Sequence, residues 1–175
     1  LIVLQLEINV DTVYHAIEFG RAHNIPVLLN PAPALSGLSR EHLAHLDFLV
    51  PNESELALIT GQVVDSPASA HKAAQTLVAD GIRHVIVTLG QQGALYVGEE
   101  GEFQIPGLSV AARDTTGAGD AFIGCFIHHW SRDRDIRAAM TQAVAYSACS
   151  VTGLGTQTSY PDATAFAEFQ RQLGA

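Results

Sequence analysis

The sequence has little that would suit a membrane span, a polyanion partner or a disulfide framework. None of its apolar runs reaches the about 18 residues needed to cross a bilayer. Nine basic residues stand against eighteen acidic ones, and the net charge of −9 argues against binding nucleic acid or an acidic membrane surface. The two cysteines, Cys125 and Cys149, form no C-x-x-C motif, so we expect buried free thiols in a cytoplasmic, reducing setting.

Several common catalytic motifs are absent too. No G-x-x-x-x-G-K-[ST] occurs, which argues against the P-loop kinases, and no G-x-S-x-G or H-E-x-x-H points to a hydrolase or a zinc site. What the chain does have is 175 residues, of which 47% are apolar and only 15% charged. That composition predicts a globular domain with a sizeable core.

Strand-like and helix-like segments alternate along the chain. Strands are expected at 1–6, 26–29, 48–50 and 83–89, helices at 11–22, 53–60, 66–78, 122–130, 136–151 and 161–173, and a hairpin at 93–105. Asp11 is a candidate N-cap for the first helix. Such alternation predicts a parallel sheet with helices on both faces and an antiparallel edge hairpin. Without a repeat or a linker, residues 1–175 are expected to form one domain.

The most informative stretch reads D-T-T-G-A-G-D at 114–120, just before an apolar helix-like segment. The N–H groups of Gly117, Ala118 and Gly119 would lie at the mouth of that helix, where the aligned peptide dipoles favour an anion. Asp120 places a carboxylate beside this pocket. An anion hole with a base next to it suits phosphoryl transfer to a hydroxyl. A Gly-rich turn that only caps a helix is the structural alternative.

This segment resembles the second signature of the ribokinase-like (PfkB) carbohydrate kinases, D-T-x-G-A-G-D followed by an apolar helix. The resemblance implies that Asp120 is the catalytic base and that Gly117, Ala118 and Gly119 form the anion hole. It implies a ribokinase-like three-layer α/β/α fold with a mostly parallel, Rossmann-like sheet. Because the chain starts inside a predicted strand, the resemblance also implies the C-terminal, nucleotide-binding and catalytic part of a longer kinase whose N-terminal half and β lid are absent here.

The family resemblance extends to the expected cofactors ATP and Mg²⁺. Asn52 and Glu55 match an N-x-x-E motif that manages Mg²⁺ through water near the nucleotide phosphates, although the same pair could simply cap a helix. Thr88, Gly90 and Gly93 match a T-L-G-x-x-G loop along ATP, with a strand-ending turn as the alternative. Together with Asn52 and Gly119, the implied nucleotide site also includes Val144, which stands where the family often has an Asn near the adenine, so base selectivity is open.

A monovalent cation, usually K⁺, is the third cofactor that the resemblance implies. The residues carried over are Asp114, Thr116, Ser150, Gly153, Gly155 and Ser159, with a Gly-rich connection between helices as the alternative. Glu7, after the first strand, corresponds to a sugar-site Glu in ribokinases or is a solvated strand end. An N-P-A-P-A run at 30–34 is also typical of ribokinases.

These observations predict an ATP-dependent sugar kinase of the ribokinase type, with D-ribose as the expected acceptor and ribose 5-phosphate as the product. Asp120 would take the proton of the attacking hydroxyl. Another kinase of the family, acting on a ketohexose, a sugar acid or a nucleoside, is the alternative within this chemistry. A nucleotide-binding fragment without activity is the alternative outside it. The expected partners are a small sugar and ATP, without nucleic acid or membrane, and the resemblance allows a homodimer of the full-length enzyme.

Overall fold

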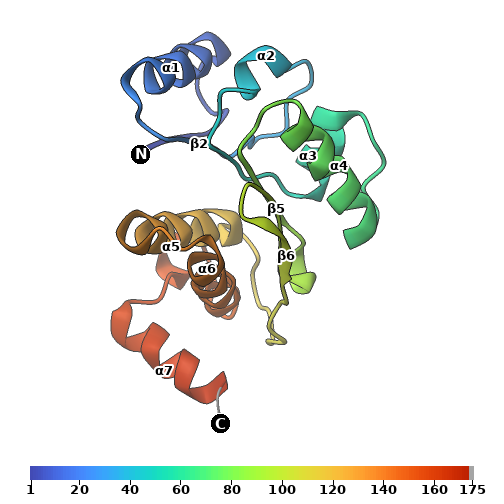
Figure 1. Ribbon diagram of the computed structural model, residues 1–175. Helices are drawn as coiled ribbons and strands as arrows, with labels where there is room; N and C mark the ends of the chain where they lie inside the picture. Colours follow the sequence, from blue (N-terminus) through green and yellow to red (C-terminus); the bar gives the residue numbers. More distant parts are fainter. Residues whose placement is uncertain (174–175) are drawn as a thin grey trace. The chain divides into compact units, whose positions relative to one another are not determined.

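The computed structural model describes residues 1–173, which divide into two compact units. Unit 1 comprises Leu1–Leu89 and Leu95–Gln104, and unit 2 comprises Gly90–Ala94 and the chain from Ile105 onward. Unit 1 holds nearly all of the β-sheet, and unit 2 holds the D-T-T-G-A-G-D segment and the last three α-helices (Figure 1).

The sheet of unit 1 has six strands in the order β1-β2-β3-β4-β5-β6. They are β1 (Ile2–Leu4), β2 (Val27–Leu29), β3 (Phe48–Leu49), β4 (His84–Thr88), β5 (Ala94–Gly98) and β6 (Gly101–Ile105). The first four pair in parallel, with Val3 opposite Leu28 and Phe48 opposite His84. β5 and β6 are joined by Glu99 and Glu100 alone, a link short enough only for antiparallel neighbours. The predicted parallel sheet with an edge hairpin is confirmed.

Four helices of unit 1 build the main hydrophobic core against one face of this sheet. They are α1 (Val10–His23), α2 (Arg40–Leu43), α3 (Glu53–Thr60) and α4 (Pro67–Ala79). Alternate strand residues such as Leu29, Leu49 and Val87 join the same buried cluster as Ile17 of α1 and Leu77 of α4. Because successive strand side chains point to opposite faces, this alternation fixes which face the helices cover.

Helix ends in unit 1 follow local capping rules, with one correction. Ser66 caps α4 with its side chain, and Gly61 ends α3 in the left-handed conformation that glycine adopts at low cost, at φ 69°. Asp11 is not the cap of α1, as the sequence analysis expected. Asn9 takes that place, and its side chain accepts the Asp11 N–H at 2.8 Å. The one-turn helix α2 was not predicted, because four residues show no periodicity.

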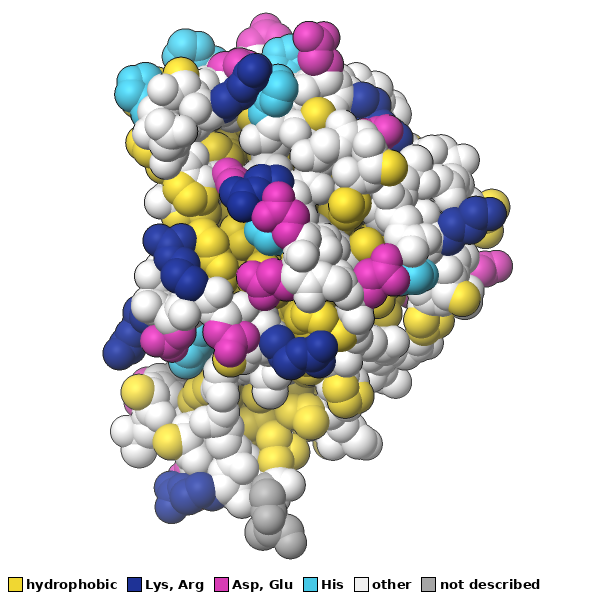
Figure 2. Space-filling view, viewed as in Figure 1, with side chains coloured by type: hydrophobic (Ala, Val, Ile, Leu, Met, Phe, Trp, Pro, Cys, Tyr) yellow, Lys and Arg dark blue, Asp and Glu magenta, His cyan; other side chains and the backbone are white. Residues whose placement is uncertain are grey.

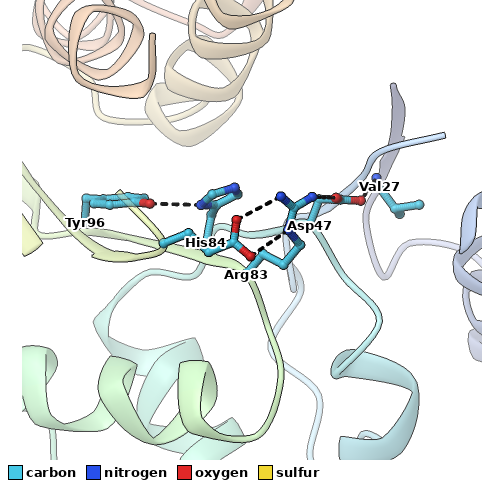
Figure 3. Close-up of polar contacts among 6 residues, drawn as sticks. Val27, Asp47, Arg83, His84 and Tyr96 are labelled. Atoms are coloured by element: carbon cyan, nitrogen blue, oxygen red, sulfur yellow. Dashed lines mark hydrogen bonds and ion pairs between the residues drawn. The ribbon is translucent and has the colours of Figure 1, made fainter. Parts of the chain in front are cut away.

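A polar cluster joins the amino ends of β2, β3 and β4 (Figure 3). The Arg83 guanidinium donates to the Asp47 carboxylate at 2.9 Å and to both oxygens of Glu99, at 3.0 and 2.8 Å. Asp47 also accepts the Val27 N–H at 2.9 Å. Ligands of parallel α/β sheets bind at the opposite, carboxyl ends of the strands. This cluster therefore links the amino ends of the strands. A ligand site is expected at their carboxyl ends.

Unit 2 is built on two packed helices, α5 (Ala118–Asp133) and α6 (Ile136–Ser150), which lie side by side in Figure 1. Phe122, Phe126 and Trp130 of α5 and Met140 of α6 are buried. The terminal helix α7 (Ala163–Leu173) is held to α6 by ring contact of Tyr146 with Phe166, with ring centroids 5.1 Å apart, and by a Gln170–Gln142 hydrogen bond of 2.7 Å. Unit 2 also contains the 3₁₀ turns Gly90–Gln92 and Gln157–Ser159.

The visible surface carries no continuous basic area. In Figure 2 the Lys and Arg side chains appear as separate spots, several of them next to Asp or Glu side chains. Arg40 pairs with Asp80, and Arg83 with Asp47 and Glu99. Over residues 1–173, no helix combines the length and the apolar character that crossing a bilayer requires.

Candidate active site

Polar residues that follow the four parallel strands form a row along the carboxyl edge of the sheet in unit 1. The Gln5 side chain donates to the Asn30 side chain at 3.3 Å, and the Asn30 amide donates to the Val50 carbonyl at 2.9 Å. Asn52, three residues after β3, forms a parallel β-bridge with Thr88, the last residue of β4. The structure thus brings the predicted Asn52 and Thr88 together at the edge where such folds bind ligands.

Asn52 and Glu55 form a complete capping box at the start of α3. The Asn52 side chain accepts the Glu55 N–H at 2.9 Å, and the Glu55 carboxylate accepts the Asn52 N–H at 2.8 Å and its side-chain amide at 2.9 Å. Glu55 is only 5% exposed, and burial raises its pKa while the bonds from Asn52 oppose that rise. Both carboxylate oxygens are engaged, so this pair suits Mg²⁺ held through water better than direct coordination.

Three other predicted site residues, Glu7 of unit 1 and Gly90 and Gly93 of unit 2, differ in how tightly they are held. Glu7 is exposed in the bend after β1, next to Leu6, whose N–H donates to the Ala32 carbonyl at 2.8 Å. Gly93 is buried, at φ 91°, and a Cβ there would come within 2.0 Å of the Ile105 carbonyl oxygen. Gly90, at φ 53°, has no such neighbour within 4 Å. The T-L-G-x-x-G turn therefore needs Gly93 for close packing and Gly90 only for its backbone conformation.

The N-terminus of α5 in unit 2 carries the predicted anion hole. Gly117 is the N-cap at φ 78°, and no side chain caps this helix. Gly119 and Asp120 lie in the first turn, the part of a helix whose N–H groups can face a bound anion. Ala118 differs from the expectation of a free amide, because its N–H donates to the Thr115 carbonyl at 3.2 Å in the turn that enters the helix. Gly119 and Asp120 are exposed.

The Asp114 carboxylate organises the approach to this helix. One oxygen accepts both the Thr116 N–H, at 2.9 Å, and the Thr116 hydroxyl, at 2.7 Å. The other accepts the Gly155 N–H at 2.9 Å. These bonds lower the pKa of Asp114, those from Thr116 most strongly, because they stabilise the charged form. The carboxylate is thus held ionised beside two chain segments that the sequence alone could not join.

The other residues predicted for a monovalent cation also gather in unit 2. A Cβ placed on Gly153 would lie 2.9 Å from the Ser159 side chain and 3.6 Å from the Ser150 carbonyl oxygen, so these three positions are in contact. The Val151 carbonyl accepts the N–H groups of Arg113 and Asp114 at 2.8 and 3.2 Å. Val144, predicted near the adenine, is 7% exposed on α6. A carboxylate among backbone carbonyls is a donor set that suits a hard cation.

Two hydroxyls reach the start of α5, and sequence reasoning missed both. The Tyr160 hydroxyl donates to the Gly117 carbonyl at 3.0 Å, and the Ser147 hydroxyl donates to the Ala118 carbonyl at 3.0 Å. The Tyr160 oxygen lies only 2.5 Å from where a Cβ of Gly117 would stand, which explains the glycine. Sequence separations of 43 and 29 residues leave no local pattern that could have revealed these bonds.

The sequence matches a known family of proteins. The model of the pfkB family of carbohydrate kinases matches residues 3–163, which include every predicted site residue. The chain belongs to the pfkB family of carbohydrate kinases. It is 52% identical to a deoxyribokinase of Salmonella typhi over 97% of its length and 55% of that protein, and 38% identical to the ribokinase of Schizosaccharomyces pombe over 92% and 52%. The chain thus spans about half the length of the curated pfkB relatives it matches.

Solved structures of pfkB kinases show the same fold. The ribokinase of Thermotoga maritima matches with a TM-score of 0.85 at 34% identity over 97% of this chain and 56% of that one. An Arabidopsis thaliana ribokinase complexed with ribose and ATP gives 0.89 at 25% identity over 95% and 54%. A putative ribokinase of E. coli in complex with ATP and Mg²⁺ gives 0.76 at 25% identity over 93% and 54%. The predicted ribokinase-like three-layer α/β fold is confirmed.

Proposed function

We propose that the protein phosphorylates a hydroxyl of a pentose with ATP, and that unit 2 supplies the catalytic base and the anion hole. The observation that carries the proposal is the uncapped, glycine-led start of α5 with Asp120 exposed in its first turn. Membership of the pfkB family supports it. So does the similarity to an A. thaliana ribokinase complexed with ribose and ATP.

The acceptor is either D-ribose or its 2-deoxy analogue. Sequence motifs favoured ribose, and the S. pombe ribokinase at 38% identity agrees with that interpretation. The 52% identity to a protein named deoxyribokinase favours the deoxy sugar. We therefore place 2-deoxyribose first and ribose second, with Glu7 as the candidate sugar contact of this chain. A ketohexose, a sugar acid or a nucleoside is the alternative within the family.

In the proposed reaction Asp120 orients the attacking hydroxyl and accepts its proton. The new oxygen–phosphorus bond forms as the bond from the γ-phosphorus to the bridging oxygen of ADP breaks. Because the transition state is loose, the proton leaves late and positioning contributes more than basicity. The Gly117 and Gly119 amides would donate to the oxygens of the moving group, where negative charge is concentrated, while the Ala118 N–H is engaged by the Thr115 carbonyl.

The chain offers residues for ATP and Mg²⁺ that fit those groups. Mg²⁺, when bound, would neutralise charge on the phosphate oxygens. Asn52 and the buried Glu55 would hold its waters, because both carboxylate oxygens already accept hydrogen bonds in the capping box. Thr88, Gly90 and Gly93 would lie along the nucleotide, and Val144 would offer an apolar contact to the base.

A monovalent cation such as K⁺ is proposed for the carbonyl-rich site around Asp114. The cation would supply positive charge that fixes the turn before α5. Asp114 and Thr116 would hold it from one side, and Gly153, Gly155, Ser150 and Ser159 from the other. The hydrogen bonds that keep Asp114 ionised support this assignment. A homodimer of the intact enzyme remains a proposal from the family resemblance.

The function is tested by assaying the intact protein with ATP, Mg²⁺ and K⁺ against 2-deoxy-D-ribose and D-ribose in parallel. We expect a 5-phosphate product, detected by mass spectrometry, and a higher kcat/KM for the deoxy sugar. Absence of any phosphorylated pentose would contradict the proposal. A further assay on the 175-residue chain alone measures whether it binds ATP without turnover, which is the outcome expected for an inactive nucleotide-binding fragment.

A further inference from the structure

We propose that Ser147 and Tyr160 are positioning residues for the first peptide groups of α5, Ser147 by aiming the Gly119 N–H of the anion hole and Tyr160 by fixing the turn that leads into it. This inference rests on the proposed function and concerns how the site is assembled. Both residues lie in unit 2 with α5. They act on the site through the backbone of α5 and are assigned no contact with the reacting atoms.

Two consecutive peptide groups at the start of α5 each join a carbonyl to the next N–H. A trans peptide is planar, so its C=O and N–H point in opposite directions and turn together. The carbonyl of Gly117 shares a peptide plane with the N–H of Ala118, and the carbonyl of Ala118 shares one with the N–H of Gly119. A hydroxyl that fixes either carbonyl therefore fixes the direction of the next N–H. The Ala118 N–H donates to the Thr115 carbonyl within the entry turn, so the Tyr160 bond fixes that turn, whereas the Ser147 bond sets the direction of the Gly119 N–H.

Each of these two carbonyls has one hydroxyl donor from a distant segment. Tyr160 donates to Gly117 at 3.0 Å, and the Gly117 carbonyl also accepts the Ala121 N–H of α5 at 2.9 Å. Ser147, on α6, donates to Ala118 at 3.0 Å. Each of the two side chains thus holds one of two consecutive peptide planes.

A hold of this kind matters because no side chain caps the start of α5, where the backbone bonds from Ala118 to Thr115 and from Ala121 to Gly117 are the other restraints described. Gly117 is its N-cap, and no side chain bonds the first N–H groups. Glycine loses the most conformational freedom on folding, so its peptide groups are costly to keep in one orientation. Helix α3, which also begins at a predicted site residue, differs because the Asn52 side chain caps it.

Tyr160 also lies within the electrostatic reach of the proposed base. Burial raises the pKa of Tyr160, and the charge of Asp120 raises it further. A neutral phenol that donates its proton to a carbonyl is the form that this site favours. Tyr160 thus interacts both with the Gly117 peptide, through a hydrogen bond, and with the charge of Asp120.

The test compares hydroxyl deletions in the intact enzyme with matched deletions elsewhere in unit 2. Tyr160→Phe and Ser147→Ala each remove one hydroxyl from the α5 peptides. Tyr146→Phe removes a tyrosine hydroxyl that donates to the Pro161 carbonyl at 2.9 Å, and Thr141→Val removes an α6 hydroxyl that donates to the Arg137 carbonyl at 2.8 Å. The controls lose bonds of similar length that do not involve α5.

We expect Tyr160→Phe and Ser147→Ala each to lower kcat roughly three- to tenfold, less than the loss of an anion-hole donor itself. KM for sugar and for ATP should stay within about twofold, because the ground state needs these amides less than the transition state does. The affinity for ADP with aluminium fluoride, a planar mimic of the moving group, should fall in parallel with kcat. Ser147→Thr, which keeps a hydroxyl, should retain activity. The two controls should change kcat by less than about twofold.

Three outcomes distinguish a failure of the positioning role from a failure of the proposed function. If Asp120→Asn abolishes turnover while the folded Tyr160→Phe and Ser147→Ala variants keep the wild-type kcat, the positioning role is refuted and the proposed function stands. If Asp120→Asn itself leaves turnover intact, the proposed function is refuted and this inference with it. A fall in kcat that the two control variants share at an equal loss of melting temperature would show a purely structural effect and would also overturn the inference.

Discussion

The Asp114 carboxylate accepts a hydrogen bond from the Gly155 N–H at 2.9 Å, although 41 residues separate the two in the sequence. This bond joins the turn before α5 to the connection after α6. Because Thr116 donates to the other carboxylate oxygen, Asp114 both shapes its own turn and links two segments of unit 2 through one charged group. Its role in positioning the turn before α5 therefore depends on its charge.

Replacing Asp114 by Asn tests that dependence. One amide oxygen can still accept a bond from Thr116, but the NH₂ group faces the Gly155 N–H, donor against donor. We expect activation by K⁺ to weaken on the order of 10- to 100-fold, the range seen when a ligand's supporting contacts are lost. The measurement is turnover against K⁺ concentration at constant ionic strength. Asp162→Asn, which alters an acceptor of the Ala165 N–H in the same unit, is the matched control.

The lowered pKa of Asp114 also sets the pH range of its effect. A carboxyl group whose pKa is lower in the folded state stabilises that state above its unfolded pKa, and the contribution is lost as the pH falls through the folded value. The difference in stability between wild type and Asp114→Asn should therefore be constant at neutral pH and should shrink only below about pH 4. A difference that changes between pH 6 and 8 would contradict the assignment.

Glu55→Gln separates the capping role of Glu55 from its charge. Burial raises the pKa of Glu55, so the ionised form costs folding free energy above the pKa of the unfolded chain. The variant keeps an oxygen for the Asn52 N–H, and its stability relative to wild type should rise as the pH increases from about 4 towards neutrality. Half-maximal activity should need roughly tenfold more Mg²⁺. Glu53→Gln, in the same helical turn, should change neither quantity, and an unchanged Mg²⁺ requirement in Glu55→Gln would argue against a metal role.

Gly93→Ala should destabilise the protein far more than Gly90→Ala. A Cβ at position 93 would stand 2.0 Å from the Ile105 carbonyl oxygen and 2.5 Å from the Gly107 nitrogen, both backbone atoms that cannot move aside alone. At position 90 only the positive φ opposes a side chain, at about 1–2 kcal/mol. We expect a loss of roughly 3 kcal/mol or more at position 93. Urea unfolding of both variants measures the difference, and equal losses would show that the packing of this turn differs from the one described.

His84 should make the stability of the protein fall in mild acid. Its ring lies 7% exposed between Phe48 and Tyr96, and burial lowers its pKa, aided by Arg83 and opposed by Glu99 and Asp47. A histidine whose pKa is lowered by folding binds its proton more readily in the unfolded chain, so stability falls as the pH drops below about 6.5.

The His84→Gln variant, measured by thermal unfolding from pH 5 to 8, should lose part of that pH dependence. Tyr96→Phe removes the 2.9 Å partner of the ring but keeps the histidine, so it should retain the dependence (Figure 3). If both variants follow the wild-type curve, the acid sensitivity arises from another group.

Local signals in the sequence predicted most elements of this fold, because the physics that forms them is local. Ser66 and Gly61 mark helix ends by their own capping chemistry, and the bounds of α3 agree with the prediction on both sides. Asn9 and Asp11 show the limit of this approach. Both are good capping residues, and only the backbone conformation decides between them.

The candidate site was predictable where a motif is contiguous and not where tertiary contacts complete it. D-T-T-G-A-G-D and N-x-x-E are short runs whose residues act within one turn. Ser147 and Tyr160 reach their partners across 29 and 43 residues, so no pattern in the sequence marks them. The bond from Ala118 to Thr115 was missed for a related reason, since the shape of a turn depends on how its ends are held.

Turnover and nucleotide affinity of Asp120→Asn in the intact enzyme test the central claim most directly. Asparagine keeps the size of Asp120 but cannot accept the proton of the sugar hydroxyl. The account predicts that ATP affinity, measured by calorimetry, stays within about threefold while kcat falls by roughly 10²–10⁴. Near-normal kcat in a folded variant that binds ATP would contradict the assignment of Asp120 as the base.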